Sequence, residues 1–505
     1  MWTTDIKLTK IKDLPGNHAK THSMLIPGKL LYFMEKTFTI ITLGCKVNQC
    51  ESDNIALGLC QKGWIELPPY GDTPGAPKAA LIIVNSCAVT QKGAMQSRQA
   101  VRKLLRHHPD ATAVITGCYA QVFPEELEAI EGHTVVIGHE KKLDIPELAE
   151  KLVSVHETGN SYITDILKTS RFKPLEAISC ESPLLYEQNQ RNDDKRTRAF
   201  LKIQDGCDTY CTYCIVPHAR GKSRSMPMED VLANLSADKQ KGYQETVLTG
   251  IHLGFYGRDL NPPENLEKLL VMLSRHRDRI PKRLRLSSIE PMELTNGILE
   301  LANASDLLCR HFHIPLQSGD DDILNRMKRP YNTRNFIELV LRIKEAMSDA
   351  SIGIDVMAGF PGETDASFER TCNLIKMLPI TYLHVFPFSP RKGTPAYHFK
   401  DKVSSHIAKK RAKTLRELGM EKKHAYFNQR SGGTGVVLVE SKQDGETGLL
   451  TGHTSDYIPV LLEGLSDGTD REILKNRFVN VVLKKNNDRD MMTGFITGMD
   501  HSPDL

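Results

Sequence analysis

Three cysteines crowd into one short segment of the chain. Cys207, Cys211 and Cys214 lie in the run Asp205-Gly-Cys-Asp-Thr-Tyr-Cys-Thr-Tyr-Cys214. Three closely spaced thiolates can hold three corners of a cubane iron–sulfur cluster, because soft thiolate ligands suit such clusters. No fourth cysteine follows closely, so one iron would keep an open coordination position. An open iron favours binding of a substrate or cofactor over simple electron transfer.

A structural zinc site is the main alternative for these cysteines. Such sites are usually closed by four ligands, and no Cys-x2-Cys partner pair lies nearby in the sequence. His218 follows Cys214 closely, so a Cys3His zinc site stays open as an alternative. The cysteine spacing, with Tyr213 directly before the last cysteine, is similar to that of radical S-adenosylmethionine (SAM) enzymes. That resemblance implies an iron–sulfur cluster and SAM as cofactors.

Three further cysteines follow predicted strands in the N-terminal segment. The β-branched, apolar strand candidates are 37–43, 79–85, 111–116 and 135–138. Helical patterns at 92–107 and 144–153 alternate with them, which predicts an open parallel α/β sheet. Cys45, Cys87 and Cys118 lie just past three of these strand ends, where such sheets bind ligands. We therefore predict a second metal cluster there, with three buried structural thiols as the alternative.

The middle of the chain repeats a strand–helix unit. The predicted strands are 199–204, 246–249, 283–288, 311–316, 352–357 and 382–388. The predicted helices are 228–240, 264–276, 295–303, 333–347, 366–377 and 404–428. These units fit a partial (β/α)6 barrel better than a doubly wound sheet, although periodicity alone does not separate the two. Loops after the strands build the active site of a barrel, and the Cys207–Cys214 loop follows the first strand.

Polar residues and glycines follow the other predicted strands and would converge on the same rim. The candidates for binding a cofactor with amino, carboxylate, ribose and adenine groups are Thr249, Gly250, Ser288, Glu290, Gln317, Gly359, Gly362 and Glu363. A turn without a ligand is the alternative for residues 359–364. No catalytic residue is predicted beyond the cluster ligands. Arg220 and Arg224 follow the third cysteine and could face a negatively charged cofactor or RNA, or lie in solvent.

The last segment, about 430–498, changes to an all-β pattern. Its predicted strands are 436–440, 457–462, 478–484 and 492–497, with Gly and Asp turns between them. This pattern predicts a small β-barrel. Small β-barrels often bind RNA, but many serve only as structural appendages, so the fold alone leaves both roles open.

Composition bounds the rest of the chain. A hydrophobic content of 40% and a charged content of 25% are ordinary for a soluble globular protein, and no stretch approaches the ~20 apolar residues of a membrane span. The eleven cysteines, without a secretory signal, indicate a reducing compartment and a cytoplasmic protein. The net charge of +4 is too mild to establish nucleic-acid binding. Two basic runs, 275–285 and 409–423, would on their own be solvated helix faces.

From Met34 to about Gly498, these residues resemble the radical-SAM methylthiotransferases. The resemblance implies an N-terminal cluster domain at 34–156, a radical-SAM barrel at 198–429 and a TRAM-like RNA-binding β domain at 430–498. Residues 1–33 would be a disordered or wrongly assigned extension, and 157–197 a polar linker. The run Thr42-Leu-Gly-Cys-Lys-Val-Asn-Gln49, with Glu51, resembles the MtaB branch. That branch acts on N6-threonylcarbamoyladenosine at position 37 of tRNA.

The resemblance also implies the chemistry. Two 4Fe–4S clusters, on Cys45, Cys87 and Cys118 and on the Cys207–Cys214 loop, would work with SAM to add a methylthio group at C2 of the adenine. The partner would be the anticodon loop of a tRNA, held by the basic runs and the β domain, and the electron and sulfur donors stay unidentified. The alternatives are an isopentenyladenosine-tRNA or ribosomal-protein aspartate methylthiotransferase. A non-catalytic, redox-sensing, RNA-binding iron–sulfur protein is an alternative of another class.

Overall fold

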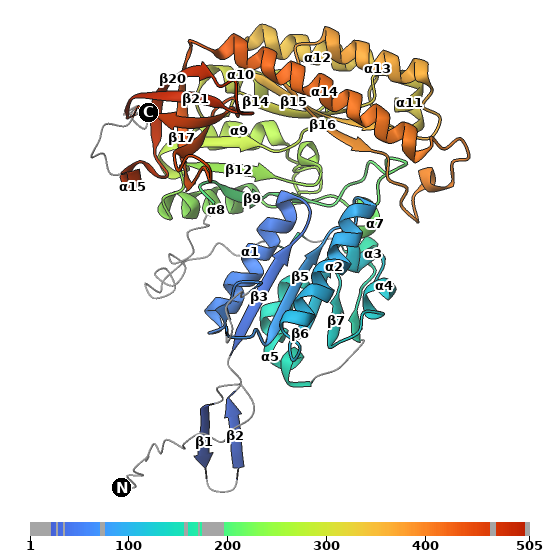
Figure 1. The fold of residues 1–505 in the computed structure, drawn as a ribbon, viewed down its shortest axis with the longest axis vertical. Coiled ribbons are helices and arrows are strands. Elements are labelled where there is room, and N and C mark those ends of the chain that lie inside the picture. The colour runs from blue at the N-terminus through green and yellow to red at the C-terminus, as the bar shows by residue number, and fades with distance from the viewer. Residues whose placement is uncertain are drawn as a thin grey trace.

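A computed structural model describes residues 22–26, 29–33, 36–70, 76–155, 160–169, 172–173, 196–464 and 471–499. The described chain forms an N-terminal parallel sheet with helices, a half-open barrel of parallel strands and a closed β-barrel at the C-terminal end (Figure 1). The predicted fold class is therefore confirmed in all three segments. Within the described residues, no helix is long and apolar enough to cross a membrane.

The N-terminal domain is a parallel sheet covered by helices on both faces. Its strands, in spatial order, are β4 (Ile65–Glu66), β3 (Thr37–Thr42), β5 (Leu81–Ser86), β6 (Thr112–Gly117), β7 (Thr134–Ile137) and β8 (Asn160–Tyr162). The helices are α1 (Lys46–Gln61), α2 (Gln91–His107), α3 (Cys118–Val122), α4 (Glu125–Glu128) and α5 (Ile145–Val155). Buried side chains form one core with α2, α3 and α4, and a second core with α1 and α5. A sheet covered on both faces explains why its strands are apolar throughout.

Two segments that were expected to lack regular structure contain strands. Residues 160–162, expected in a polar linker, form β8 and extend the sheet through pairing of Val136 with Ser161. The strand was missed because it is short and polar. Pairing with β7, rather than its own side-chain pattern, stabilises it. Strands β1 (His22–Ile26) and β2 (Lys29–Phe33) pair antiparallel in the region expected to lack structure. The expectation for residues 1–21, and for most of 157–197, lies outside the described residues.

The barrel consists of two adjoining three-stranded parallel sheets. The first contains β9 (Ala199–Lys202), β12 (Glu245–Thr249) and β13 (Arg283–Leu286), and the second contains β14 (His311–Gln317), β15 (Ser351–Ala358) and β16 (Tyr382–Pro387). The backbone of Leu284 bonds to Leu307 across the junction, which joins the two halves into one curved wall. Short strands β10 (Gln204–Asp205) and β11 (Arg224–Ser225) flank the cysteine loop.

Helices cover the outer face of this wall. They are α8 (Met228–Gln240), α9 (Leu266–Ser274), α10 (Asn296–Ala304), α12 (Thr333–Ala346), α13 (Asp365–Met377) and α14 (Ser405–Arg430), whereas α7 (Val216–Arg220) packs on α3 of the N-terminal domain and α11 (Asp321–Arg326) belongs to a smaller cluster. The alternate strand residues that point outward pack with these helices into the largest core of the described chain. Their neighbours in sequence must therefore line the inner face of the barrel, because strand side chains alternate between faces.

The C-terminal barrel closes in the order β17 (Thr434–Gln443), β18 (Leu450–Thr454), β19 (Pro459–Glu463), β21 (Met492–Met499) and β20 (Phe478–Lys485). A short helix, α15, spans Arg471–Leu474. Strand β18 was not predicted, because its buried positions are Leu450, Gly452 and Thr454, and only the first of these is a large apolar residue. Its pairing with β17 completes the closure.

The β domain sits against the amino-terminal ends of the barrel strands. Arg285 donates to the carbonyls of Ser455 and Thr454 at 3.0 and 3.2 Å. Arg283 and Arg285 both bond to the buried carboxylate of Glu245. These two arginines belong to the basic run 275–285, so the expectation of a solvated or RNA-binding run is wrong for them. They alternate along β13, which turns both side chains to the inside of the barrel.

Candidate functional site

The cysteines of the first set lie at one edge of the N-terminal sheet. Strands β3, β5 and β6 are parallel neighbours, so their carboxyl ends share an edge. Cys45 directly precedes α1, Cys87 follows the last residue of β5, and Cys118 begins α3. Cys118 is buried, Cys87 is half-buried and Cys45 is exposed. The structure therefore brings the three predicted residues to one edge, which is open at Cys45.

Glycine and amide side chains hold these loops close together. The Asn48 side-chain amide donates to the Leu43 carbonyl at 2.8 Å and to the Ser86 carbonyl at 3.2 Å. Gly44 has φ +101°, and a Cβ there would lie 3.0 Å from the Cys87 sulfur. Gly117 has φ +92°, and a Cβ there would lie 2.5 Å from the Ser86 carbonyl oxygen. Both positions thus require glycine, for backbone conformation and for space.

Substituting Gly117 tests how tightly the loops must pack. Gly117→Ala is expected to destabilise the fold by at least about 2 kcal/mol, because strain in the left-handed region adds to a clash with backbone atoms. Gly63→Ala is the matched control, since Gly63 also has positive φ but no atom within 4 Å of an added Cβ. Denaturant unfolding of both variants measures the difference. Equal losses for the two would contradict this packing.

The spacing of the sulfurs separates a cluster from a single metal ion. A tetrahedral zinc site, with Zn–S bonds of about 2.3 Å, needs its sulfurs about 3.8 Å apart. Over the described residues, neither cysteine triplet has all three sulfurs within 4.8 Å of one another. His218, the possible fourth zinc ligand, is exposed and packs against the Tyr210 ring instead. Both donor sets therefore fit a multi-iron cluster better than zinc.

Arg220 reaches from the barrel into the N-terminal cysteine site. It is fully buried, and its Nε donates to the Cys118 sulfur at 3.3 Å. Its Nη1 bonds to Glu51 at 3.0 Å and to Asp205 at 2.8 Å. Arg224 is also buried. The expectation that these arginines could lie in solvent or face RNA is therefore wrong, because a carboxylate from each domain draws Arg220 inward.

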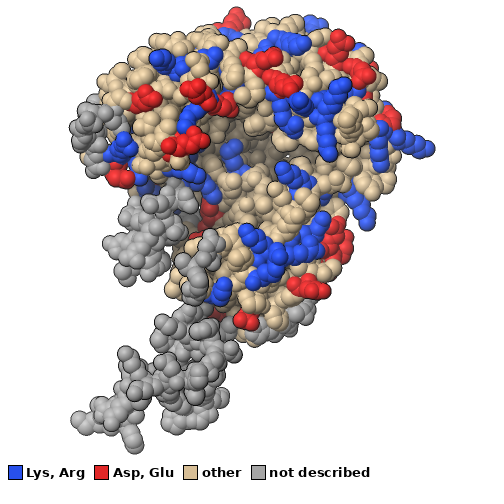
Figure 2. Space-filling view, viewed as in Figure 1, with Lys and Arg blue, Asp and Glu red and all other residues tan. Residues whose placement is uncertain are grey.

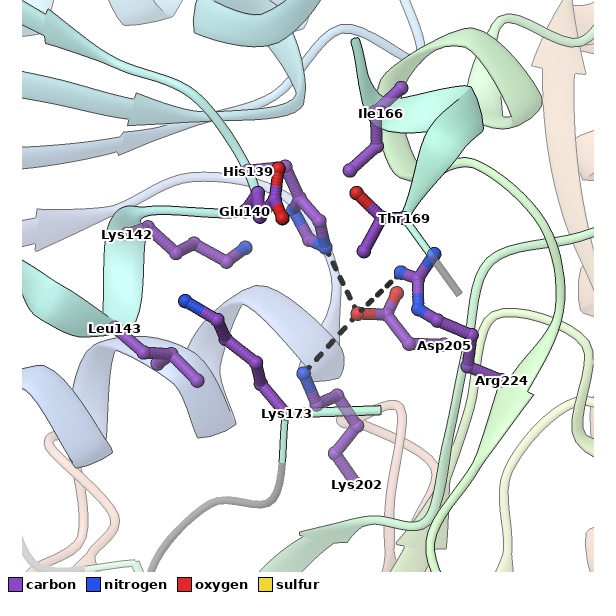
Figure 3. Close-up of a pocket in the computed structure, with 10 residues that line it drawn as sticks. All are labelled: His139, Glu140, Lys142, Leu143, Ile166, Thr169, Lys173, Lys202, Asp205 and Arg224. Atoms are coloured by element: carbon purple, nitrogen blue, oxygen red, sulfur yellow. Dashed lines mark hydrogen bonds and ion pairs between the residues drawn. The ribbon is translucent and has the colours of Figure 1, made fainter. Parts of the chain in front are cut away.

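A buried network of charges surrounds this arginine. Glu51 also binds the ammonium groups of Lys142 and Lys202, and Asp205 binds Lys202 and His139. Burial alone would raise the pKa of Glu51, but the charges of Arg220, Lys142 and Lys202 hold it well below its usual range. Figure 3 shows His139, Lys202 and Arg224 converging on the Asp205 carboxylate.

The network carries more positive than negative charge. Arg220, Lys142, Lys202 and Arg224 supply four cations against the two carboxylates of Glu51 and Asp205, which leaves two positive charges in surplus. Burial lowers the pKa of His139 to about 3, so this imidazole adds no charge. Buried charges need partners. Burial raises the pKa of Cys118 and Cys87, so their sulfurs would become such partners as thiolates when they bind a metal, and the surplus of positive charge beside Cys118 suits an anionic metal centre there.

The second triplet lies between the ends of the first barrel strands. His252 Nδ1 lies 3.3 Å from the Cys207 sulfur, and its other nitrogen lies 2.7 Å from Glu293. Burial alone would raise the pKa of Cys207, but the hydrogen bond from His252 lowers it. Arg329 Nη1 donates to the Cys211 sulfur at 3.2 Å. His252 thus favours the thiolate form of Cys207, which is the form that binds metal, whereas burial raises the pKa of Cys211 despite Arg329 and also raises that of Cys214.

The predicted cofactor residues fall into two groups. Glu290 binds Arg329, which in turn contacts Cys211, so Glu290 lies beside the second triplet. Ser288 is exposed, and Gln317 is half-buried on the same rim. Thr249 is buried and Gly250 half-buried after β12, where Gly250 approaches the Gln204 side chain. These residues remain candidates for contact with SAM.

The glycine loop after β15 has a different set of contacts. The Glu363 carboxylate accepts from the Gly359 amide at 2.9 Å and from Arg411 of α14 at 2.6 Å. A Cβ on Gly359 would lie 2.4 Å from the Ala408 Cβ, and one on Gly362 would approach Arg326. The described contacts of this loop thus bind it to the helices, and they favour a packing role for Gly359, Gly362 and Glu363.

Several site residues had no signal in the sequence analysis. Lys142 and Lys202 meet Glu51 from segments far apart in the chain, so no local spacing marks them, and Glu51 itself was noted only as part of a motif and not for its charge. Arg329 and His252 lie outside the motifs considered. His252 follows the glycine after β12, on the rim, and a search for cationic residues at strand ends would have found it.

Comparisons with known proteins agree with this geometry. The profile described as Radical SAM superfamily matches residues 201–375, and that of the uncharacterized protein family UPF0004 matches residues 37–138. The threonylcarbamoyladenosine tRNA methylthiotransferase MtaB of Bacillus subtilis is 35% identical over 85% of this chain and 91% of its own. That of Aquifex aeolicus is 34% identical over 84% and 96%. A tRNA-2-methylthio-N(6)-dimethylallyladenosine synthase of Carboxydothermus hydrogenoformans is 29% identical over 86% and 94%.

A solved structure resembles this chain in fold over most of its length. TsrM of Kitasatospora setae, a radical S-adenosylmethionine methyltransferase, matches with a TM-score of 0.50 at 14% identity, over 72% of this chain and 77% of its own. At that identity the likeness concerns the fold alone. The fold and the cysteine loop define a radical-SAM enzyme. With its curated relatives, the chain belongs to the radical-SAM methylthiotransferase family.

Proposed function

We propose that this protein adds a methylthio group to C2 of N6-threonylcarbamoyladenosine at position 37 of tRNA. The observation that carries the proposal is the pair of cysteine triplets, each at the carboxyl edge of parallel strands and each paired with a buried arginine. The identity of about 35% to MtaB proteins over most of the chain supports this branch.

Cys207, Cys211 and Cys214 would hold the radical-SAM cluster, and Cys45, Cys87 and Cys118 the auxiliary cluster. When bound, these clusters and SAM supply the radical and the sulfur chemistry that a C–H bond without an acidic proton requires. The protein residues hold the thiolates. Arg329 and His252 contact the sulfurs of Cys211 and Cys207, and Arg220 contacts that of Cys118. The Glu51–Asp205 network fixes Arg220, and so joins the two sites across the domain boundary.

Basic surfaces beside the domain boundary would hold the RNA. Helix α2 carries five Lys or Arg residues and no acidic residue. Figure 2 shows Lys and Arg gathered over this helix, next to the hollow between the barrel and the N-terminal domain. Lys409, Lys410 and Lys413 are exposed on α14, whereas Arg411 is buried against Glu363 and Asp365. Such cations contribute phosphate contacts that position an RNA.

Neutralising α2 should therefore weaken tRNA binding in a salt-dependent way. The variant with Lys92, Arg102 and Arg106 changed to Gln is expected to lower the slope of log affinity against log salt by about 2, at roughly 0.7–0.9 per lost contact. The control changes Lys36, Lys62 and Lys151 to Gln, because Lys36 and Lys62 pair with residues of α5 and Lys151 lies on α5, which covers the face of the sheet opposite α2. Filter binding across a salt series measures both. An unchanged slope in the α2 variant would exclude this surface.

The substrate assignment is tested on anticodon stem–loops. Anaerobically reconstituted enzyme, SAM, a reductant and sulfide are incubated with stem–loops that carry either threonylcarbamoyladenosine or dimethylallyladenosine, and nucleosides are analysed by mass spectrometry. We expect a methylthio product from the threonylcarbamoyl substrate. Product from the dimethylallyl substrate alone would place the enzyme in the other tRNA branch. Absence of 5′-deoxyadenosine from SAM would favour a non-catalytic iron–sulfur protein.

A further inference from the structure

Three polar side chains meet on adjacent strands in the second half of the barrel. His313 lies on β14, Asp355 on β15 and His384 on β16, and Asp355 pairs directly with His384 in the strand register. His313 Nε2 lies 2.9 Å from the Asp355 carboxylate, and His384 Nδ1 lies 3.5 Å from the same oxygen. Neither the cysteine sites nor the charged network includes these residues.

The cluster faces the interior of the barrel. Its sequence neighbours Ile314 and Ile354 are buried in the core beneath the helices, so the cluster lies on the opposite face of the strands. The His384 side chain is 55% exposed and that of Asp355 is 21% exposed. A molecule inside the barrel can therefore reach both groups.

The cluster is ordered on one side and open on the other. His313 Nδ1 bonds to the Tyr382 hydroxyl at 3.1 Å, and that hydroxyl bonds to His311 at 2.8 Å. Burial alone would raise the pKa of Asp355, but hydrogen bonds from His313 and His384 hold it below its usual range. Asp355 contacts Nδ1 of His384, and Nε2 of this half-exposed ring has no hydrogen-bond partner among the described residues.

The depth of the cluster suits one part of a modified adenosine. Asp355 is level with Pro315, two residues before the rim residue Gln317 along β14. A register shift after Pro315 places Gln317 opposite Val356, so the cluster lies one to two residues, or about 3–7 Å, below the rim. A base that presents C2 at the rim can direct its N6 substituent inward, because C2 and C6 lie on opposite sides of N1 in the ring.

We propose that Asp355 and His384 form the subsite for the N6 substituent, and that they select the acidic threonylcarbamoyl group over an apolar dimethylallyl group. The inference rests on the proposed function. As an imidazolium between two carboxylates, His384 donates from Nδ1 to Asp355 and from Nε2 to the threonyl carboxylate. An apolar substituent would desolvate His384 and leave its Nε2 without a partner, a strong source of discrimination.

The test compares two substrates with one substitution. His384→Phe keeps a flat ring but loses both nitrogen atoms, and we expect kcat/KM for the threonylcarbamoyl stem–loop to fall about 100-fold relative to the dimethylallyl stem–loop. Iron content and reductive cleavage of SAM should stay unchanged. His384→Gln should restore part of the preference, because its amide can still donate. His406→Phe, an exposed histidine on α14, is the matched control.

The outcomes are separable. A wild-type enzyme that modifies neither stem–loop, or only the dimethylallyl one, overturns the proposed function itself. A wild-type preference for threonylcarbamoyladenosine that His384→Phe leaves intact overturns only the subsite. The three ligand atoms also lie within 4.8 Å of one another. One zinc per wild-type chain that His384→Phe removes would therefore overturn the subsite too, since the residues would then be metal ligands.

Discussion

Changing Cys45, Cys87 and Cys118 together to alanine is expected to remove half of the iron and nearly all of the methylthiolation. The reconstituted wild-type chain should hold about eight irons, as two clusters of about four. The variant should keep about four and still cleave SAM, because the Cys207–Cys214 loop is untouched. Methylthiolation should fall at least about 1,000-fold, since the cofactors carry the difficult step. Iron analysis and product mass spectrometry measure both effects.

The converse variant and a control complete this prediction. Changing Cys207, Cys211 and Cys214 to alanine should also leave about four irons, but should abolish SAM cleavage. Cys60→Ala, on α1 and outside both triplets, should retain the iron and the activity. Full turnover by the protein without Cys45, Cys87 and Cys118 would contradict the assignment of an auxiliary cluster.

Changing Glu51 to Gln is expected to destabilise the fold by about 3–5 kcal/mol, as is usual when one partner of a buried ion pair is removed. The carboxylate is fully buried and binds Arg220, Lys142 and Lys202. Without this carboxylate, Arg220, Lys142 and Lys202 each lose an anionic partner. Chemical unfolding of the cluster-free protein measures the loss. Glu150→Gln is the control, since its partner Lys36 is exposed, and it should cause no measurable change.

The lowered pKa of Glu51 predicts that the stability of the fold depends on pH. Because the folded protein holds the pKa of Glu51 well below its usual value, the contribution of Glu51 to stability is fully present above the ordinary glutamate range. It is lost as the pH falls from that range toward the lower folded value. Wild type and Glu51→Gln should therefore converge in stability on acidification. A constant difference down to low pH would contradict an ionised, buried Glu51.

The sequence was sufficient for most of the architecture. Alternating strands and helices predicted every strand of the half-open barrel within a few residues, because their apolar runs are strong and their turns are marked. Strands β8 and β18 escaped prediction, since pairing with a neighbour rather than side-chain pattern orders them. Glycine and small polar residues in β18 carry no apolar period.

The functional residues were predictable where their spacing or position in the sequence marks them. Cys207, Cys211 and Cys214 are marked by spacing, and Cys45 by its position after a strand. The environment of these cysteines was not predictable, because Glu51 and Arg220 lie far apart in sequence and meet only in the folded chain. The charge of the run 275–285 led to the wrong expectation that Arg283 lies in solvent. Its alternation with Arg285 along β13 indicates instead that both side chains face the inside of the barrel.

The central claim is tested most directly by the tRNA nucleosides of cells that lack this protein. Mass spectrometry of bulk tRNA should show that 2-methylthio-N6-threonylcarbamoyladenosine is missing while N6-threonylcarbamoyladenosine accumulates. The wild-type gene should restore the modification, and a gene with Cys45, Cys87 and Cys118 changed to alanine should not. An undiminished level of the methylthio nucleoside in the deletion strain, with no second enzyme of this family in the cell, would contradict the account.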